Sequence, residues 1–189
     1  MTTHATLDEL KMRLDITGDQ DDAVLTSVLE AASRQVDGWC GRAFASGTGA
    51  RQLTADTWQL LILPDDLHSI SGIVVDRDGD RVYETVWQLT DIDLSPYPGP
   101  YQVVRPRGGK AFPTHSYAVQ ITGDWGFGSE APAPIREATL LQAIRLYKRK
   151  DAPFGVTGSA EHGQLQTISR VDPDVKELIA PFVRNPMAV

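Results

Sequence analysis

Three carboxylates alternate along one short segment and are the first candidates for chemistry. Asp76, Asp78 and Asp80 are separated by single residues, which is how a calcium-binding EF-hand loop presents its first ligands. That loop also requires glycine at its sixth position and glutamate at its twelfth, and here those positions hold Arg81 and Trp87. The sequence therefore predicts a solvated hairpin tip in this segment and no metal site.

The four histidines do not form a zinc motif. They are His4, His68, His115 and His162, and no two lie three to five residues apart, as helical and finger-type zinc pairs require. Residues 65–68, with the sequence DDLH, place carboxylates beside an imidazole directly after a proline. For this segment we expect a polar turn between two strands.

Motifs for nucleophilic catalysis and nucleotide binding are incomplete. The sequence contains no Gly-x-Ser-x-Gly elbow, and the segment 126–129, GFGS, has no predicted helix directly behind its serine. A dinucleotide fingerprint that begins at Gly47 would need glycine at position 52, where the chain has Gln52. The glycines of segment 155–163 have neither the lysine nor the preceding strand of a P-loop. No cofactor is expected.

One enzyme hypothesis remains after these exclusions. Asp91 and Asp93, together with His115, offer dispersed groups for a metal-dependent nuclease or hydrolase. No complete catalytic motif supports this hypothesis, so the sequence favours a protein without enzymatic activity.

Two basic clusters stand out in a chain whose formal net charge is −7. The segment 105–110, RPRGGK, is expected at the tip of a hairpin or long loop, where it is either a solvated turn or a contact for phosphates or a partner's carboxylates. The segment 145–150, RLYKRK, ends a predicted helix, where cations complement the helix dipole. The net acidity argues against a free-standing protein that reads DNA sequence.

The elements that position these residues begin with a helical hairpin. Thr6 and Glu9 have the spacing of a capping box, so the first helix starts there. A second helix is predicted from about Asp21 to Gly41, and Gly41 is suited to end it. The single cysteine, Cys40, excludes an intrachain disulfide and is expected to be a buried thiol at the end of this helix.

The middle of the chain reads as short strands between turn residues. A hairpin with a tight turn at Asp78-Gly79 is the clearest pair. The expected strands are 51–54, 58–63, 70–76, 82–89, 101–104 and 117–122.

Helical periodicity returns towards the C-terminus. A long buried helix is expected from Pro134 to Lys150, then a loop at 151–168 without periodicity, then a short helix from Asp172 that stops near Pro181. The predicted fold class is α+β: an N-terminal helical hairpin, a small antiparallel sheet or sandwich, a long helix, a flexible loop and a short helix. We expect a single domain, 1–189, whose helical parts are 6–41 and 134–183 and whose β-rich insertion is 50–123.

The sequence shows no membrane or export signal. It contains no apolar run of about 18 residues, which a membrane span requires, and its N-terminus lacks the charged-then-apolar order of a signal peptide. The expected location is therefore intracellular.

Both ends of the chain resemble a known family. The opening LDELKMRLDI, followed by DDAVLTSVLEAASRQVDGWCGRAF, resembles the start of head-to-tail connector proteins, also called adaptor or head-completion proteins, of tailed bacteriophages and gene transfer agents. The later stretches GDWGFGSEAPAPIREATLLQAIRLYKRKDAPFGVTG and ISRVDPDVKELIAPF are similar to the family's C-terminal part. The middle, about 50–115, matches in kind more than in residues.

The resemblance implies a structural protein without catalytic activity. Members form a ring, usually a dodecamer, which docks beneath the portal, joins it to a tail-completion or stopper protein, and lets packaged DNA pass through its lumen. The implied locations are the virion neck and, during assembly, the host cytoplasm. The alternative is another neck or tail-completion protein of the tail-terminator type, a class that typically lacks the paired N-terminal helices.

The resemblance also implies two sets of contact residues. The loop after the long helix and the C-terminal tail are the expected contacts with the portal or a neighbouring subunit, through Phe154, Val156, Phe182 and Arg184. The basic tip is expected to face the DNA in the lumen, through Arg105, Arg107 and Lys110.

Overall fold

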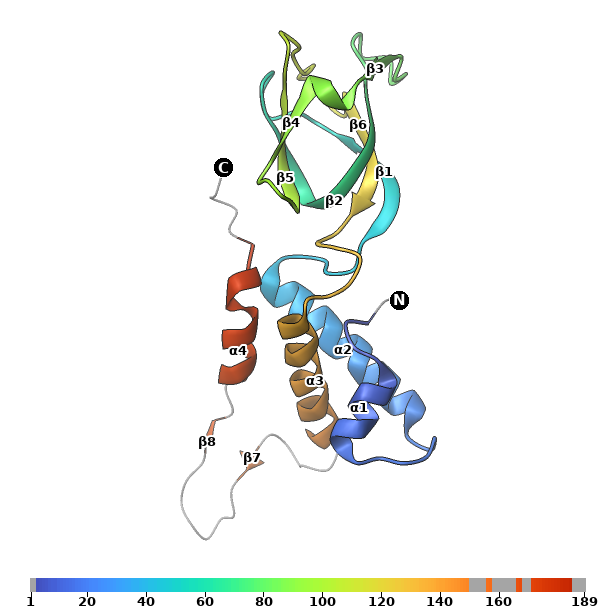
Figure 1. Cartoon of the computed structure of the whole chain (residues 1–189), viewed down its shortest axis with the longest axis vertical. Coiled ribbons are helices and arrows are strands. Elements are labelled where there is room, and N and C mark those ends of the chain that lie inside the picture. The colour runs from blue at the N-terminus through green and yellow to red at the C-terminus, as the bar shows by residue number, and fades with distance from the viewer. Residues whose placement is uncertain (1–2, 150–155, 158–165, 168–170, 185–189) are drawn as a thin grey trace. The chain divides into compact units, whose positions relative to one another are not determined.

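The chain folds into two compact units, which are described separately. A computed structural model describes residues 3–149, 156–157, 166–167 and 171–184 (Figure 1). The helical unit consists of the residues up to Gly41 and Ala131–Arg184, and the β unit is Arg42–Glu130. In this described part of the chain, every helix is too short or too polar to cross a membrane.

The first helix, α1 (Leu7–Leu14), starts at the predicted capping box. The Glu9 N–H donates to the Thr6 hydroxyl at 3.2 Å, and the Thr6 N–H donates to the Glu9 carboxylate at 2.8 Å. Asp15 ends the helix in the left-handed conformation, with φ of 54°. Both backbone donors of the box are thus satisfied, and the start of α1 follows from local sequence.

The second helix, α2 (Asp22–Cys40), confirms the predicted helical hairpin. It ends where Gly41 takes a φ of 62°, a left-handed conformation that glycine adopts without steric cost. Its buried side chains recur at helical spacing and include Leu25, Leu29 and Val36. Cys40 is buried and makes no disulfide, as the sequence predicted.

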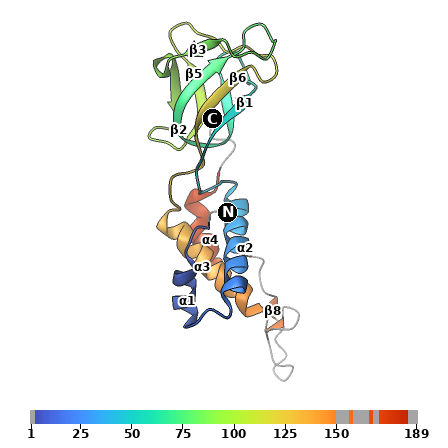
Figure 2. The same ribbon diagram turned by 90° about the vertical axis from the view of Figure 1, so that its right-hand side faces the viewer.

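Two further helices complete the helical unit. They are α3 (Ala133–Lys148), with Pro134 in its first turn, and α4 (Pro173–Ile179), which runs into a 3-10 turn, η4 (Ala180–Phe182). α3 packs against the other helices of the unit, and Figures 1 and 2 show α4 alongside it. The core of the unit contains Ala5, Leu10, Leu25, Leu29, Ala32, Leu140 and Ala143.

The loop after α3 contains a short backbone ladder that periodicity did not indicate. Strands β7 (Val156–Thr157) and β8 (Gln166–Thr167) pair antiparallel. Pairing between two-residue strands leaves no periodic pattern in the sequence, which is why this segment reads as irregular.

The β unit is one curved, six-stranded antiparallel sheet, visible at the top of Figures 1 and 2. The sequence predicted either a small antiparallel sheet or a sandwich, and the structure has the sheet. The strand order is β1-β6-β2-β5-β4, and β3 pairs with β2. The strands are β1 (Gly47–Leu53), β2 (Leu61–Val75), β3 (Thr85–Trp87), β4 (Ile92–Ser95), β5 (Tyr101–Pro106) and β6 (Val119–Trp125). A short 3-10 turn, η1 (Leu89–Asp91), precedes β4.

The predicted polar turn at 65–68 is wrong, because these residues lie inside the long strand β2. Asp66 is buried there, and it accepts hydrogen bonds from the Arg42 guanidinium at 2.8 Å and the Gln102 amide at 3.1 Å. A buried carboxylate is tolerated when it is paired in this way. The two strands predicted at 58–63 and 70–76 are therefore one strand, which register shifts bend between Ile62 and Gly72.

The expected hairpin between β2 and β3 exists, but its turn is not tight. Val75 pairs with Thr85, so nine residues, 76–84, form the loop, and the predicted strand at 82–89 shortens to β3. β4 was not predicted at all. Its sequence, IDLS, is too short and too mixed to signal a strand without its partner β5.

The chain enters and leaves the β unit through two adjacent segments. The Phe127 N–H donates to the Ala43 carbonyl at 2.8 Å, and the Ser46 N–H donates to the Gly128 carbonyl at 3.1 Å. Gly126 lies where these two segments meet and has a φ of 136°. A Cβ atom on Gly126 would stand 2.6 Å from the Ala45 carbonyl oxygen. Only glycine fits this approach.

A second close approach occurs at the bend of β2, and it gives the first prediction. A Cβ atom on Gly123 would overlap the carbonyl oxygen of Ser69, whereas one on Gly72, in the same sheet, would meet the Thr122 Cβ at an ordinary 4.0 Å. We predict that Gly123→Ala lowers the free energy of unfolding by about 1–3 kcal/mol, as overpacking in a close-packed region does. Urea unfolding followed by fluorescence measures the change.

Gly72→Ala is the matched control, with an expected change within about 0.5 kcal/mol. Equal effects of the two substitutions would contradict the assignment of strain to the Ser69–Gly123 contact.

Candidate functional site: a basic groove and an acidic loop on the β unit

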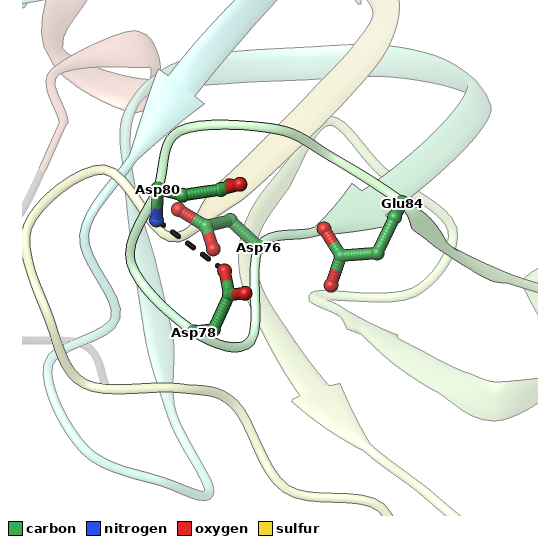
Figure 3. A group of neighbouring side chains, drawn as sticks. All are labelled: Asp76, Asp78, Asp80 and Glu84. Carbon is green, nitrogen blue, oxygen red and sulfur yellow. Dashed lines mark hydrogen bonds between the residues drawn. The ribbon is translucent and has the colours of Figure 1, made fainter.

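Four carboxylates converge in the loop between β2 and β3, which we call the acidic loop (76–84). One carboxylate oxygen from each of Asp76, Asp78, Asp80 and Glu84 lies within 4.8 Å of the others. Figure 3 shows the four side chains gathered around the loop. Asp76 is buried and the other three side chains are exposed. The loop thus brings together more acidic groups than the three that the sequence spacing singled out.

Asp76 closes this loop through the backbone. One of its carboxylate oxygens accepts the Gly79 N–H at 2.8 Å, and the other accepts the Arg81 N–H at 2.9 Å. Burial opposes the charged form, but these N–H donors and the positive charge of His115 outweigh it, so the pKa of Asp76 is lowered from its ordinary value of 3.8. The arrangement accounts for the acidic loop as a structural turn.

The titration of Asp76 gives the second prediction. A group with a lowered pKa in the folded state stabilises folding above its ordinary pKa, and the contribution is lost as the pH falls through the lowered value. Asp76→Asn replaces one acceptor oxygen by an amide that faces backbone donors. We therefore expect a lower urea midpoint than that of the parent chain at pH 7, and a difference that shrinks as the pH falls below the ordinary value of 3.8.

Asp78→Asn provides the comparison, because Asp78 is exposed and accepts only a longer bond from the Asp80 N–H, at 3.3 Å. A pH-independent effect of Asp76→Asn, or an equal effect of Asp78→Asn, would contradict this account of the loop.

A second feature of the β unit is an open cavity of about 520 Å³, which we call the basic groove. One wall is the turn Thr57–Leu60, and the other is the segment Arg105–Lys110. The Phe112 N–H donates to the Trp58 carbonyl at 2.9 Å, which ties the two walls together. The groove therefore joins segments that lie almost fifty residues apart in the sequence.

The first wall is a two-residue turn, where the sequence predicted a strand. The Thr57 N–H donates to the Leu60 carbonyl at 3.0 Å, and the Leu60 N–H donates back at 3.2 Å. Trp58 and Gln59 occupy the tip of this turn, and Trp58 is 56% exposed. The exposure of this tryptophan at a turn is a feature that periodicity could not reveal.

The second wall is the basic tip that the sequence predicted. Gly108 and Gly109 take φ values of 63° and 75°, and a Cβ atom at either would meet nothing within 4 Å. The Lys110 N–H donates to the Arg107 carbonyl at 3.1 Å and closes the turn. The backbone of this wall is therefore open to close approach by a ligand.

The three cations of the groove are neutralised to different degrees. Lys110 binds the Asp91 carboxylate at 2.5 Å and lies 5.2 Å from the centre of the Trp87 ring. Arg107 contacts Asp93 at 3.3 Å. The hydrogen bond from Lys110, followed by that from the Gln88 N–H, lowers the pKa of Asp91.

Arg105 differs from the other two cations. Its side chain is exposed, and within the described ranges no carboxylate lies at ion-pair distance from it. The structure thus brings the three predicted residues to one groove, and Asp93, which lies opposite Arg105 in the β4–β5 ladder, makes its ion pair with Arg107.

The dispersed-carboxylate enzyme hypothesis receives no geometric support. Asp91 and Asp93 are engaged by Lys110 and Arg107, and the His115 ring makes its hydrogen bond with the Asp76 carbonyl at 3.1 Å. These three groups thus have separate partners in the described structure.

The predicted portal contacts fall in the helical unit or outside the described residues. Phe182 is half-buried in η4, and the Arg184 N–H donates to the Cys40 carbonyl at 2.8 Å, which ties the end of the described chain to α2. Val156 is described only as backbone of β7, and Phe154 lies outside the described residues. His162 and Lys150 lie outside them as well.

A helical unit interrupted by one antiparallel sheet defines the class of fold, and known proteins share it. Residues 4–64 match the family of phage gp6-like head-tail connector proteins. The resemblance expected from the sequence is confirmed over this part of the chain, which includes α1, α2 and β1. No curated protein sequence matches the chain.

Solved structures match over nearly the whole length. A chain from the neck of an empty gene transfer agent (GTA) particle, computed with C6 symmetry, is 21% identical with a TM-score of 0.63, and the match covers 96% of this chain and 90% of that one. A chain from the neck of a native GTA particle, computed with C12 symmetry, is 20% identical with a TM-score of 0.62 over 98% and 96%. A chain from the virion of a native GTA particle is 20% identical, with a TM-score of 0.61 over 96% and 90%. These matches show the fold.

Proposed function

We propose that the chain is a non-enzymatic structural protein of a virion neck, where it forms a ring beneath the portal and joins the DNA-filled head to the tail. The observation that carries the proposal is the fold similarity to chains from GTA necks over almost the full length of both chains. The family match of residues 4–64 points to the same role. The protein is assembled in the host cytoplasm and remains in the virion.

Ring formation requires each subunit to present two different surfaces to its neighbours. Head-to-tail contacts close into a ring only when the rotation between subunits divides the circle, as in a dodecamer. The similar chain from the neck of a native GTA particle comes from a structure computed with C12 symmetry, which supports twelve copies in this case.

The proposed partners are the portal on one side of the ring and a tail-completion or stopper protein on the other. The proposed contacts with the portal or with a neighbouring subunit are the residues that the family resemblance implies: Phe154, Val156, Phe182 and Arg184. The basic tip, with Arg105, Arg107 and Lys110, is assigned to transient, non-specific contact with packaged DNA. A role as a tail terminator is less well supported, because the chain has the paired helices α1 and α2 that such proteins typically lack.

The third prediction tests the assembly. When the chain is mixed with the portal of its own particle, native mass spectrometry and negative-stain microscopy should show a portal-bound ring of twelve copies. The chain alone, at high concentration, is the reference that shows whether ring formation requires the portal. A chain that stays monomeric and never associates with that portal would contradict the proposed function.

The fourth prediction concerns the C-terminal tail. Deletion of residues 185–189 should weaken portal binding while leaving the unfolding midpoint unchanged, because the Arg184 N–H bond to Cys40 is retained. Deletion of 183–189 removes that bond as well, and should therefore lower the unfolding midpoint. Unchanged portal binding after deletion of 183–189, which removes Arg184, would reject the tail as a portal contact.

A further inference from the structure

Two aspartates in the sequence are followed directly by glycine, and this dipeptide has a chemical reactivity of its own. They are Asp37, before Gly38, and Asp78, before Gly79. The side-chain carboxyl of an aspartate can be attacked by the backbone nitrogen of the next residue. Glycine at that next position leaves the nitrogen sterically open, because it has no Cβ atom. The local sequence is the same at both positions, so the fold decides which of them reacts.

The first dipeptide, Asp37-Gly38, is held inside α2. The Asp37 carboxylate contacts the His4 ring at 2.9 Å and the Arg34 guanidinium at 3.0 Å, and the Asp37 side chain is only 14% exposed. The helix end is anchored just beyond this point, since Cys40 is buried and its carbonyl accepts a backbone N–H at 2.8 Å. The Gly38 nitrogen belongs to the helical ladder. It can reach the Asp37 carboxyl only after the last turn of α2 unravels.

The second dipeptide, Asp78-Gly79, lies in the acidic loop, outside the strands. Asp78 is exposed, and its carboxylate accepts the Asp80 N–H at the long distance of 3.3 Å. Gly79 has a φ of 87°, and a Cβ atom there would meet nothing within 4 Å. The space needed to turn the Asp78 carboxyl towards the next backbone nitrogen is therefore present.

One hydrogen bond restrains the second dipeptide. The Gly79 N–H donates to the buried Asp76 carboxylate at 2.8 Å, so this bond must open before the nitrogen attacks Asp78. Exposed loops open locally at a lower free-energy cost than packed helices. Asp76 therefore slows the reaction at Asp78 without excluding it.

We propose that Asp78 is the position at which the folded chain converts to isoaspartate, whereas Asp37 is protected by α2. The Gly79 nitrogen forms a bond to the Asp78 side-chain carboxyl carbon, and the nitrogen's proton leaves with the carboxyl hydroxyl as water. The product is a five-membered succinimide. Water then adds to its other carbonyl and breaks the original peptide bond, so that the main chain runs through the Asp78 side chain. The two steps release and consume one water molecule, so the mass is unchanged.

Isomerisation changes the acidic loop, because it adds one carbon atom to the main chain between Asp78 and Gly79. The Gly79 N–H then no longer stands at the position that meets Asp76, so the closure of the loop is weakened. A neck protein is not replaced after the particle is assembled, so the modified form accumulates with the age of the particle. This last consequence alone rests on the proposed function.

Prolonged incubation of the full chain at pH 7, native and in guanidinium chloride, tests the proposal. Protein isoaspartyl methyltransferase measures the isoaspartate formed, and mass spectrometry of peptides locates it. The unfolded chain should convert at both Asp37 and Asp78. In the native chain, conversion at Asp78 should stay within about tenfold of the unfolded rate, and conversion at Asp37 should be at least about tenfold slower than at Asp78.

Asp78→Glu is the matched variant, because it keeps the charge but cannot close the five-membered ring. It should remove the methyl acceptance of the aged native chain, and the aged parent chain should have a lower urea midpoint than a fresh sample. Absence of isoaspartate at Asp78 in the native chain, or equal native rates at Asp37 and Asp78, would overturn the proposal. These measurements use the isolated chain, so they are independent of ring formation on the portal.

Discussion

The β unit depends on one close approach between the two segments through which the chain enters and leaves it. Gly126 brings the backbone so near to Ala45 that no side chain fits between them. Phe44 packs against Phe127 on the same crossing, with ring centres 5.3 Å apart. β1 begins and β6 ends directly beside this point, so the crossing sets the register of their ladder, whose first pair is Gly47 with Trp125.

Paired carboxylates stabilise the loops and bends that follow from this register. Asp66 lies within a bent strand because Arg42 and Gln102 satisfy it, and Asp76 closes the acidic loop by accepting backbone N–H groups. Asp91 holds Lys110, and through it the basic tip. In each case a carboxylate replaces the solvent that an irregular backbone or a nearby cation would otherwise need. These three carboxylates therefore have structural roles in the β unit.

The helices could be predicted from the sequence because the signals that define them are local. The capping box at Thr6, the glycine at position 41 and the proline in the first turn of α3 all act within a few residues. The basic tip could be predicted for a similar reason, since Gly108 and Gly109 mark a turn directly. The element types in these regions are confirmed by the structure.

The sheet and the groove could be predicted only in part, because their determinants are distant in the sequence. β4 exists through its pairing with β5, and Asp66 is acceptable in a strand only because Arg42 reaches it. Tryptophan is a residue type that is common in strands. Only the hydrogen bond from the Phe112 N–H to the Trp58 carbonyl shows that this turn lies beside the basic tip. Compensation of charge also requires the fold, since the sequence cannot show that Lys110 pairs with Asp91 and Arg107 with Asp93.

The adjacency of residues 43–46 and 126–128 has an evolutionary consequence. An insertion whose two ends meet can be lengthened, shortened or replaced while its host core keeps the same connections, because domain insertion succeeds where the ends lie close together. The β unit has this property through the Ser46–Gly128 and Ala43–Phe127 hydrogen bonds. Changes of length in its strands and loops would therefore leave the connections to α2 and α3 unchanged.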